Sequence, residues 1–165
     1  MSVERTYRYT TDLIGPEQRR ALSGLEVLER IRDGRLPMAA IADTLAFRLV
    51  EVAAGSVIFV GTPQPFAFNM HGTLDGGWTA TVLDSAMGCA VQTTVPRGFG
   101  YTTVDLTIKY LRAVTATDQP LRATGRVLRS GRRIATAEGQ LHDPAGRLVA
   151  HGLTTCLLFP IDGQS

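Results

Sequence analysis

The chain has 165 residues, 44% of them hydrophobic, which is enough for one domain with one apolar core. Its 17 basic and 15 acidic residues give a formal charge of +2, too balanced for a general nucleic-acid-binding protein. The first twenty residues are charged throughout and lack the apolar run of a secretory signal, so we expect a cytoplasmic location.

The two cysteines and one apolar segment are the features that bear on metal and membrane binding. Cys89 and Cys156 lie in apolar stretches without metal-ligand spacing, so we expect buried, reduced thiols and no metal site. Residues 76–96 contain a single charged residue, Asp84. Glycines and threonines interrupt this segment, and a central aspartate would be costly in lipid. We therefore expect a helix buried by protein, and no membrane partner.

The N-terminal part of the chain predicts short helices. Ser23 and Glu26 form a capping box, and Asp33-Gly34 supplies a helix stop. A further short turn follows. These pieces predict an N-terminal helical extension over residues 1–40 that covers a main domain over residues 41–162.

The main domain begins with a predicted hairpin and continues into one long helix. The β-rich runs FRLVEVAAG and SVIFVG start at Phe47 and are separated at Gly55. Residues 77–92 are apolar and rich in small residues, which let other backbones approach closely. We expect this helix to be buried.

Extended segments follow the helix. After Gly100 residues alternate with a period of two, and one face of this strand should carry Thr102, Val104, Leu106, Ile108 and Tyr110. Three more extended runs lie near 121–129, 133–142 and 148–159, joined by turn sequences that favour antiparallel hairpins. The order predicts an α+β fold in which a curved antiparallel β-sheet of about six strands wraps around one central α-helix.

Asp84 is the most informative residue. A carboxylate in the middle of a helix, among residues such as Leu83 and Met87, rarely lacks a partner or a chemical function. It is either held by hydroxyls of Thr81, Ser85 or a neighbouring strand, or it is an active-site carboxylate. The sequence pattern leaves both interpretations open.

Gly76-Gly77 at the helix start is the second feature. Unpaired N–H groups at a helix N-terminus can stabilise a developing oxyanion, although paired glycines also serve as plain turn residues. Gly76 and Asp84 are eight residues apart, or about 12 Å along one straight helix. One carbonyl group cannot contact both. If both act on one substrate, they come from different subunits, which favours a symmetric dimer with its site at the interface.

Three segments carry a family resemblance: NMHGTLDGGWTATVLDSAMGCA, GYTTVDLTIKYLR and GRRIATAEGQLHDPAGRLVAHGLTTC. Together they resemble the phenylacetic-acid-degradation (PaaI-type) branch of hotdog-fold thioesterases, over about residues 40–160. The resemblance implies a hotdog fold, an acyl-CoA or aryl-CoA substrate, no cofactor other than the CoA part of that substrate, and a homodimer or homotetramer.

The resemblance also implies roles for individual residues. Asp84 corresponds to the family's catalytic aspartate, and Gly76 to its oxyanion donor. Asn69 corresponds to the loop asparagine that orients the thioester. Thr103 corresponds to the hydroxyl residue that positions water near the aspartate. The alternation places Thr103 opposite the apolar series, so we expect it to face a subunit interface rather than the helix.

Asp75 departs from the family, whose members usually carry histidine before the two glycines. A carboxylate there should weaken an oxyanion site unless it is protonated or turned away. His71 can replace that histidine in part, but an ordinary loop histidine is the simpler interpretation. We expect Asp75 and Gly77 to contact the substrate.

Arginines after the helix offer a site for the nucleotide. Sixteen of the 17 basic residues are arginine, and Arg129, Arg132 and Arg133 flank the turn RSGRR. Guanidinium groups bind phosphate bidentately, so these residues either contact the CoA phosphates or are solvated turn residues.

The sequence therefore predicts an acyl-CoA thioesterase with Asp84 as nucleophile or general base. Two alternatives stay open. A hotdog dehydratase or hydratase needs a histidine paired with an acid, and Asp75 removes the obvious candidate. A non-catalytic acyl-CoA binder would have kept the fold and lost the chemistry through Asp75.

Overall fold

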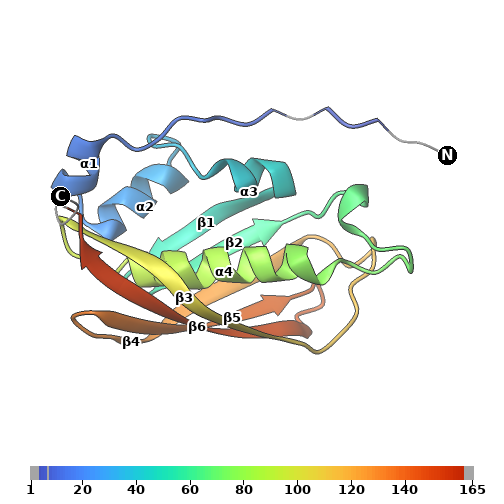
Figure 1. The fold of residues 1–165 in the computed structure, drawn as a ribbon. Helices are drawn as coiled ribbons and strands as arrows, with labels where there is room; N and C mark the ends of the chain where they lie inside the picture. Colours follow the sequence, from blue (N-terminus) through green and yellow to red (C-terminus); the bar gives the residue numbers. More distant parts are fainter. Residues whose placement is uncertain (1–3, 7, 162–165) are drawn as a thin grey trace.

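The structure, a computed structural model, describes residues 4–6 and 8–161 (Figure 1). The helices in this part of the chain are α1 (Pro16–Ala21), α2 (Gly24–Arg32), α3 (Ala40–Leu45), the 3-10 helix η1 (Pro65–Ala67) and α4 (Gly76–Gln92). The strands are β1 (Phe47–Ala53), β2 (Ser56–Gly61), β3 (Phe99–Tyr110), β4 (Leu121–Ser130), β5 (Ile134–His142) and β6 (Leu148–Pro160). Within the described residues, no helix is long and apolar enough to span a membrane.

One antiparallel sheet contains the six strands in the order β1-β2-β4-β5-β6-β3. β1 and β3 are its edges. The sheet curves around α4, which lies along its inner face (Figure 1). The predicted α+β hotdog architecture, with a central helix and short N-terminal helices, is confirmed.

α4 is buried where it crosses the sheet. Leu83, Ala86 and Met87 have no exposed surface, and glycines on the strands let the helix come close. A Cβ atom on Gly125 of β4 would lie 2.1 Å from the carbonyl oxygen of Ala86. Ala86, one of the small residues predicted in this helix, therefore lies directly against the backbone of β4.

β3 contains a bulge that changes which residues face α4. Thr103 pairs with Cys156 and Asp105 with Thr155, so Val104 is an extra residue without a partner in β6. Before the bulge Thr103 faces α4, and after it Tyr110 does. The prediction of strict alternation, with Thr103 on the face opposite Tyr110 and away from the helix, is wrong because the inserted residue shifts the side-chain register by one.

The N-terminal part of the chain packs beside α4 and β1. α2 begins with the predicted capping box, because Ser23 Oγ accepts the N–H of Glu26 and the Glu26 carboxylate accepts the N–H of Ser23. Leu22, Val27 and Leu36 form a small second core. The division into an extension over 1–40 and a domain over 41–162 stays a prediction, and residues 1–3, 7 and 162 lie outside the described residues.

Removing this cap should cost stability in a pH-dependent way. Ser23→Ala should lower the free energy of unfolding at pH 7 by about 1 kcal/mol, because the N–H of Glu26 loses its acceptor. The Ser23 backbone N–H, the Ser23 hydroxyl and Arg97 hold the pKa of Glu26 at about 2, below its usual 4.5. A lowered carboxyl pKa stabilises the fold above pH 4.5, and this contribution is lost as the pH falls toward 2. In urea unfolding, the difference in free energy of unfolding between Ser23→Ala and the wild type should shrink as the pH falls from 4.5 toward 2. An equal difference at every pH would contradict the bond from the Ser23 hydroxyl to the Glu26 carboxylate and leave only the cap.

Candidate active site

Asp84 lies in the middle of α4 with its side chain partly exposed. The Thr103 hydroxyl of β3 donates a hydrogen bond of 3.0 Å to its Oδ1 atom. The Thr81 hydroxyl, one of the two helix hydroxyls predicted as possible partners of Asp84, donates instead to the Gly77 carbonyl. In the described residues no ion pair includes Asp84. Within the part of the chain that the structure describes, the Thr103 hydroxyl is thus the side-chain donor that orients this carboxylate, through Oδ1.

A pocket of about 440 Å³ opens beside Asp84. α4 and β3 line it from the sheet side, and the N-terminal part of the chain lines it from the other side. Cys89 and Tyr101 also line it. Burial raises the pKa of the Cys89 thiol to about 12, with a further contribution from the charge of Asp84, and burial raises the pKa of the Tyr101 phenol. Both groups therefore stay protonated near neutral pH. Asp84 is the carboxylic residue of the pocket wall that α4 and β3 form.

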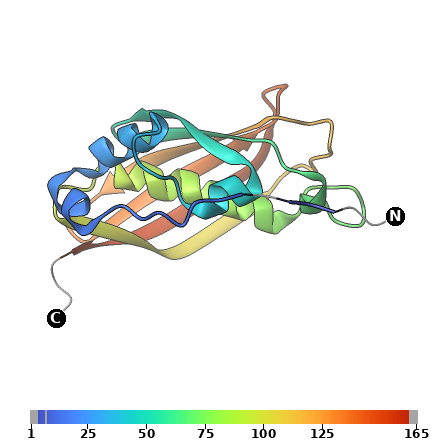
Figure 2. The ribbon, with the colours of Figure 1, turned by 90° about the horizontal axis from the view of Figure 1, so that it is seen from above.

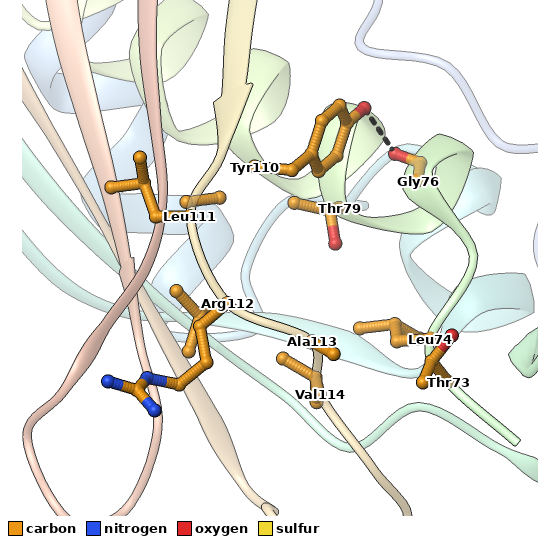
Figure 3. A pocket seen from close by; sticks show the side chains of 11 residues that line it. Thr73, Leu74, Gly76, Thr79, Tyr110, Leu111, Arg112, Ala113 and Val114 are labelled. Carbon is orange, nitrogen blue, oxygen red and sulfur yellow. Dashed lines mark hydrogen bonds between the residues drawn. The ribbon is translucent and has the colours of Figure 1, made fainter.

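The start of α4 presents the second predicted feature. Asp75 is the N-cap residue, and its Oδ1 accepts the N–H of Gly77 at 2.8 Å. The Tyr110 hydroxyl donates to the Gly76 carbonyl at 2.9 Å (Figure 3). The Asp75 carboxylate is thus turned onto the helix end, where it accepts the N–H of Gly77. It does not accept the N–H of Gly76, the first residue of the helix. Substrate contacts of Asp75 and Gly77 stay predictions.

Asn69 organises the loop before α4. Its Oδ1 accepts the N–H groups of His71 and Thr73, and its Nδ2 donates to the Thr73 hydroxyl at 2.9 Å. This side chain therefore fixes the loop that precedes Gly76. His71 is exposed on this loop.

Gly76 and Asp84 do not share a pocket within the chain. Gly76 lines a separate pocket of about 340 Å³, whose wall includes Thr73, Tyr110 and Arg112 (Figure 3). Among residues 4–6 and 8–161, none lines both this pocket and the one beside Asp84. Since α4 is one continuous helix, the two groups are separated by about 12 Å along its axis, as predicted.

Arg129, Arg132 and Arg133 come together at the turn between β4 and β5. They line a surface pocket of about 920 Å³ with Phe99 and Phe159. A contact of 3.0 Å between the hydroxyls of Thr94 and Ser130 places this turn beside the C-terminal end of α4. The three arginines thus lie together, but outside the pockets of Asp84 and Gly76.

Sequence reasoning missed two parts of these sites. Tyr110 was assigned only to an apolar strand face, although it binds the carbonyl of Gly76. The N-terminal part was predicted as a cover, but its contribution to the pocket of Asp84 was not. For Tyr110 the available signal was a tyrosine among aliphatic residues at the end of a strand. The contribution of the N-terminal part to the pocket depends on how that part packs against α4, which no local sequence pattern reveals.

A curved sheet wrapped around a central helix is the hotdog architecture, and the partly exposed aspartate of that helix is its candidate catalytic group. Comparison with known proteins agrees. The model of the thioesterase superfamily matches residues 71–150. Human acyl-coenzyme A thioesterase 13 is 33% identical over 108 residues, which are 65% of this chain and 76% of the human protein. The chain therefore belongs to the thioesterase superfamily.

Two further comparisons refine this assignment. A phenylacetic acid degradation-related protein of Ralstonia eutropha is 30% identical, with a TM-score of 0.73 over 79% of this chain and 98% of that one. A Caenorhabditis elegans protein described as an esterase is 33% identical over 67% of this chain. The chain spans 65% of the length of that relative. The resemblance to PaaI-type hotdog thioesterases, and the predicted enzyme class, are confirmed.

Proposed function

We propose that the protein hydrolyses an acyl- or aryl-CoA thioester to the free acid and CoA, with Asp84 as nucleophile or general base. The observation that carries this proposal is the Asp84 carboxylate, which borders a 440 Å³ pocket and is held by the Thr103 hydroxyl alone among described side chains. The similarity to human acyl-coenzyme A thioesterase 13 supports the same substrate class. No cofactor beyond the CoA part of the substrate is needed for this reaction.

Two routes lead to the same products. As a nucleophile, Asp84 attacks the thioester carbonyl, CoA thiolate leaves, and water then hydrolyses the mixed anhydride. As a general base, Asp84 removes a proton from water while the water attacks the carbonyl directly. In both routes a carbonyl oxygen becomes an oxyanion, which requires a hydrogen-bond donor about 3 Å away.

We propose that the Gly76 N–H of a partner subunit is this donor. β3 is an edge strand of 12 residues, and an unpaired edge is a template for another strand. Two apolar side chains of β3, Val104 and Leu106, are exposed. Met70, on the loop before α4, is 94% exposed. Pairing of β3 with its copy would join two sheets, cover this apolar surface, and bring the helix start of one chain toward Asp84 of the other. We propose a homodimer on this basis, which can pair further into a homotetramer.

We also propose that the arginines of the β4–β5 turn bind the CoA phosphates. Arg132 and Arg133 are exposed. Replacing both with alanine should raise KM for an acyl-CoA about tenfold and leave kcat nearly unchanged, because phosphate contacts contribute uniform binding. An acyl-pantetheine, which lacks the nucleotide, should show no such change. Arg126→Ala on β4 serves as the control, and equal effects on both substrates would contradict the proposal.

A non-catalytic acyl-CoA binder is the second candidate, and Asp75 is the observation that favours it. Its carboxylate binds the N–H next to Gly76, so negative charge lies near the proposed oxyanion site. A dehydratase is less compatible, because no histidine among the described residues lines the pocket of Asp84. Thiol release measured across short, long and aromatic acyl-CoAs decides between these functions. Tight binding of an acyl-CoA without turnover of any of them would support the binder.

A further inference from the structure

The chain before α2 forms one side of the pocket beside Asp84. In both ribbon views, the segment that leads to α1 runs along the length of the molecule from the η1 end (Figures 1 and 2). Arg5 fixes the start of this segment, because its guanidinium donates to the Thr44 carbonyl at 2.6 Å and lies 3.7 Å from the centre of the Phe66 ring. Ile14 fixes its end by packing on the small core of Leu22, Val27 and Leu36. The segment is therefore anchored near its start by Arg5 and at its end by Ile14.

The wall formed by residues 12–39 is mainly apolar. It includes Ile14, Leu28, Ile31, Pro37 and Met38. These residues lie outside residues 71–150, the part of the chain that the superfamily model matches. The wall thus lies outside the part of the chain that the superfamily model matches, and it borders the proposed catalytic carboxylate directly.

The pocket extends from Asp84 toward the C-terminal end of α4. Along the helix its wall includes Ser85, Cys89 and Gln92. From Asp84 to Gln92 the helix rises by about 12 Å. A volume of 440 Å³ is in the ordinary range of sites for small organic groups. A group attached to a carbonyl at Asp84 therefore has room in this direction and meets mostly carbon atoms.

The charges of the pocket argue against a charged group. Apart from Asp84, the charged lining residues are Asp12 and Arg19, which have opposite signs and are both exposed. They supply no net charge to hold a second carboxylate or an amine. Burying either in an apolar pocket without a partner would be costly.

We infer that residues 12–39 form the acyl-binding wall of the site, and that the pocket takes an uncharged, apolar acyl group no longer than about 12 Å. This inference rests on the proposed function, since it assigns the substrate of that same site. The pocket selects among acyl-CoAs by the length and polarity of the acyl group, and the wall contributed by the N-terminal part sets the limit.

Ala39→Trp tests the wall. Ala39 lines the pocket, is exposed, and makes no side-chain cap bond at the start of α3, so the larger residue removes no interaction. The indole should occupy space beside the acyl group. The ratio of kcat/KM for octanoyl-CoA to that for acetyl-CoA should fall at least about tenfold. Ala145→Trp, the same change at an exposed alanine of the β5–β6 turn, should leave the ratio as in the wild type. An unchanged ratio in Ala39→Trp would overturn the inference.

A binding measurement separates this inference from the proposed function. Calorimetry on Asp84→Asn should show octanoyl-CoA binding at least about tenfold more tightly than CoA, because the octanoyl chain leaves water. Adding Ala39→Trp should remove most of this advantage. One outcome is that the wild type hydrolyses no acyl-CoA while octanoyl-CoA still binds more tightly than CoA and Ala39→Trp removes this difference. In that case the hydrolase proposal fails and the acyl pocket stands. If turnover depends on Asp84 but octanoyl-CoA binds no better than CoA, the acyl pocket fails and the hydrolase stands.

Discussion

Asp84→Asn should lower kcat for acyl-CoA hydrolysis about a thousandfold or more, whether the carboxylate attacks the carbonyl or removes a proton from water. An amide can do neither. It has nearly the same shape, and its oxygen can still accept the Thr103 hydroxyl that binds Oδ1 at 3.0 Å. No ion pair of the described residues is broken. Folding should therefore be preserved while the chemistry is lost.

Thiol release and thermal unfolding, measured side by side, check this result. Asp43→Asn on α3 is the matched control, since it makes the same exchange at an exposed helix aspartate and should keep full activity. Single turnover in oxygen-18 water then separates the two routes, because only the nucleophile route places solvent oxygen in the Asp84 carboxylate. A fully active Asp84→Asn would remove this residue from the mechanism.

The predictable part of the fold was encoded in local patterns. The capping box located α2, the run of small apolar residues located α4, and turn residues separated β4, β5 and β6. Asp84 stood out because a lone charge in an apolar helix needs a reason. Each of these signals lies within a few residues of sequence, and each is therefore independent of how distant parts of the chain meet.

The features that the sequence did not reveal depend on distant contacts. The bulge at Val104 follows from the way β3 fits β6, and one extra residue turned Thr103 toward Asp84. The resemblance to the thioesterase family associated Thr103 with the aspartate, whereas simple alternation placed it on the wrong face. The wall over residues 12–39 likewise depends on anchors such as Arg5 to Thr44, 39 residues apart. Contacts of this kind determine which side chains reach the site, but they produce no periodic pattern in the sequence.

Two inactive variants should restore activity when they share a dimer, if Asp84 and Gly76 act across an interface. Gly76→Pro removes the proposed donor N–H at the first helical position, where proline is tolerated. Asp75 before it has an extended backbone, with ψ of 139°, which suits a residue preceding proline. The loss of one oxyanion donor should cost about 10²- to 10³-fold in kcat. Gly76→Ala is the steric control, because it keeps the N–H and adds a Cβ atom 3.2 Å from the Tyr110 ring.

Coexpression of Asp84→Asn and Gly76→Pro chains with two different tags yields mixed dimers that can be isolated. In such a dimer one site combines the intact Asp84 of one chain with the intact Gly76 of the other, while the second site carries both changes. Activity per dimer should therefore return to about half of the wild-type value. If one chain supplied both groups, each site would keep one defect, and the mixed dimers would be no more active than the two variants alone. The 12 Å between these groups along α4 makes recovery the expected result.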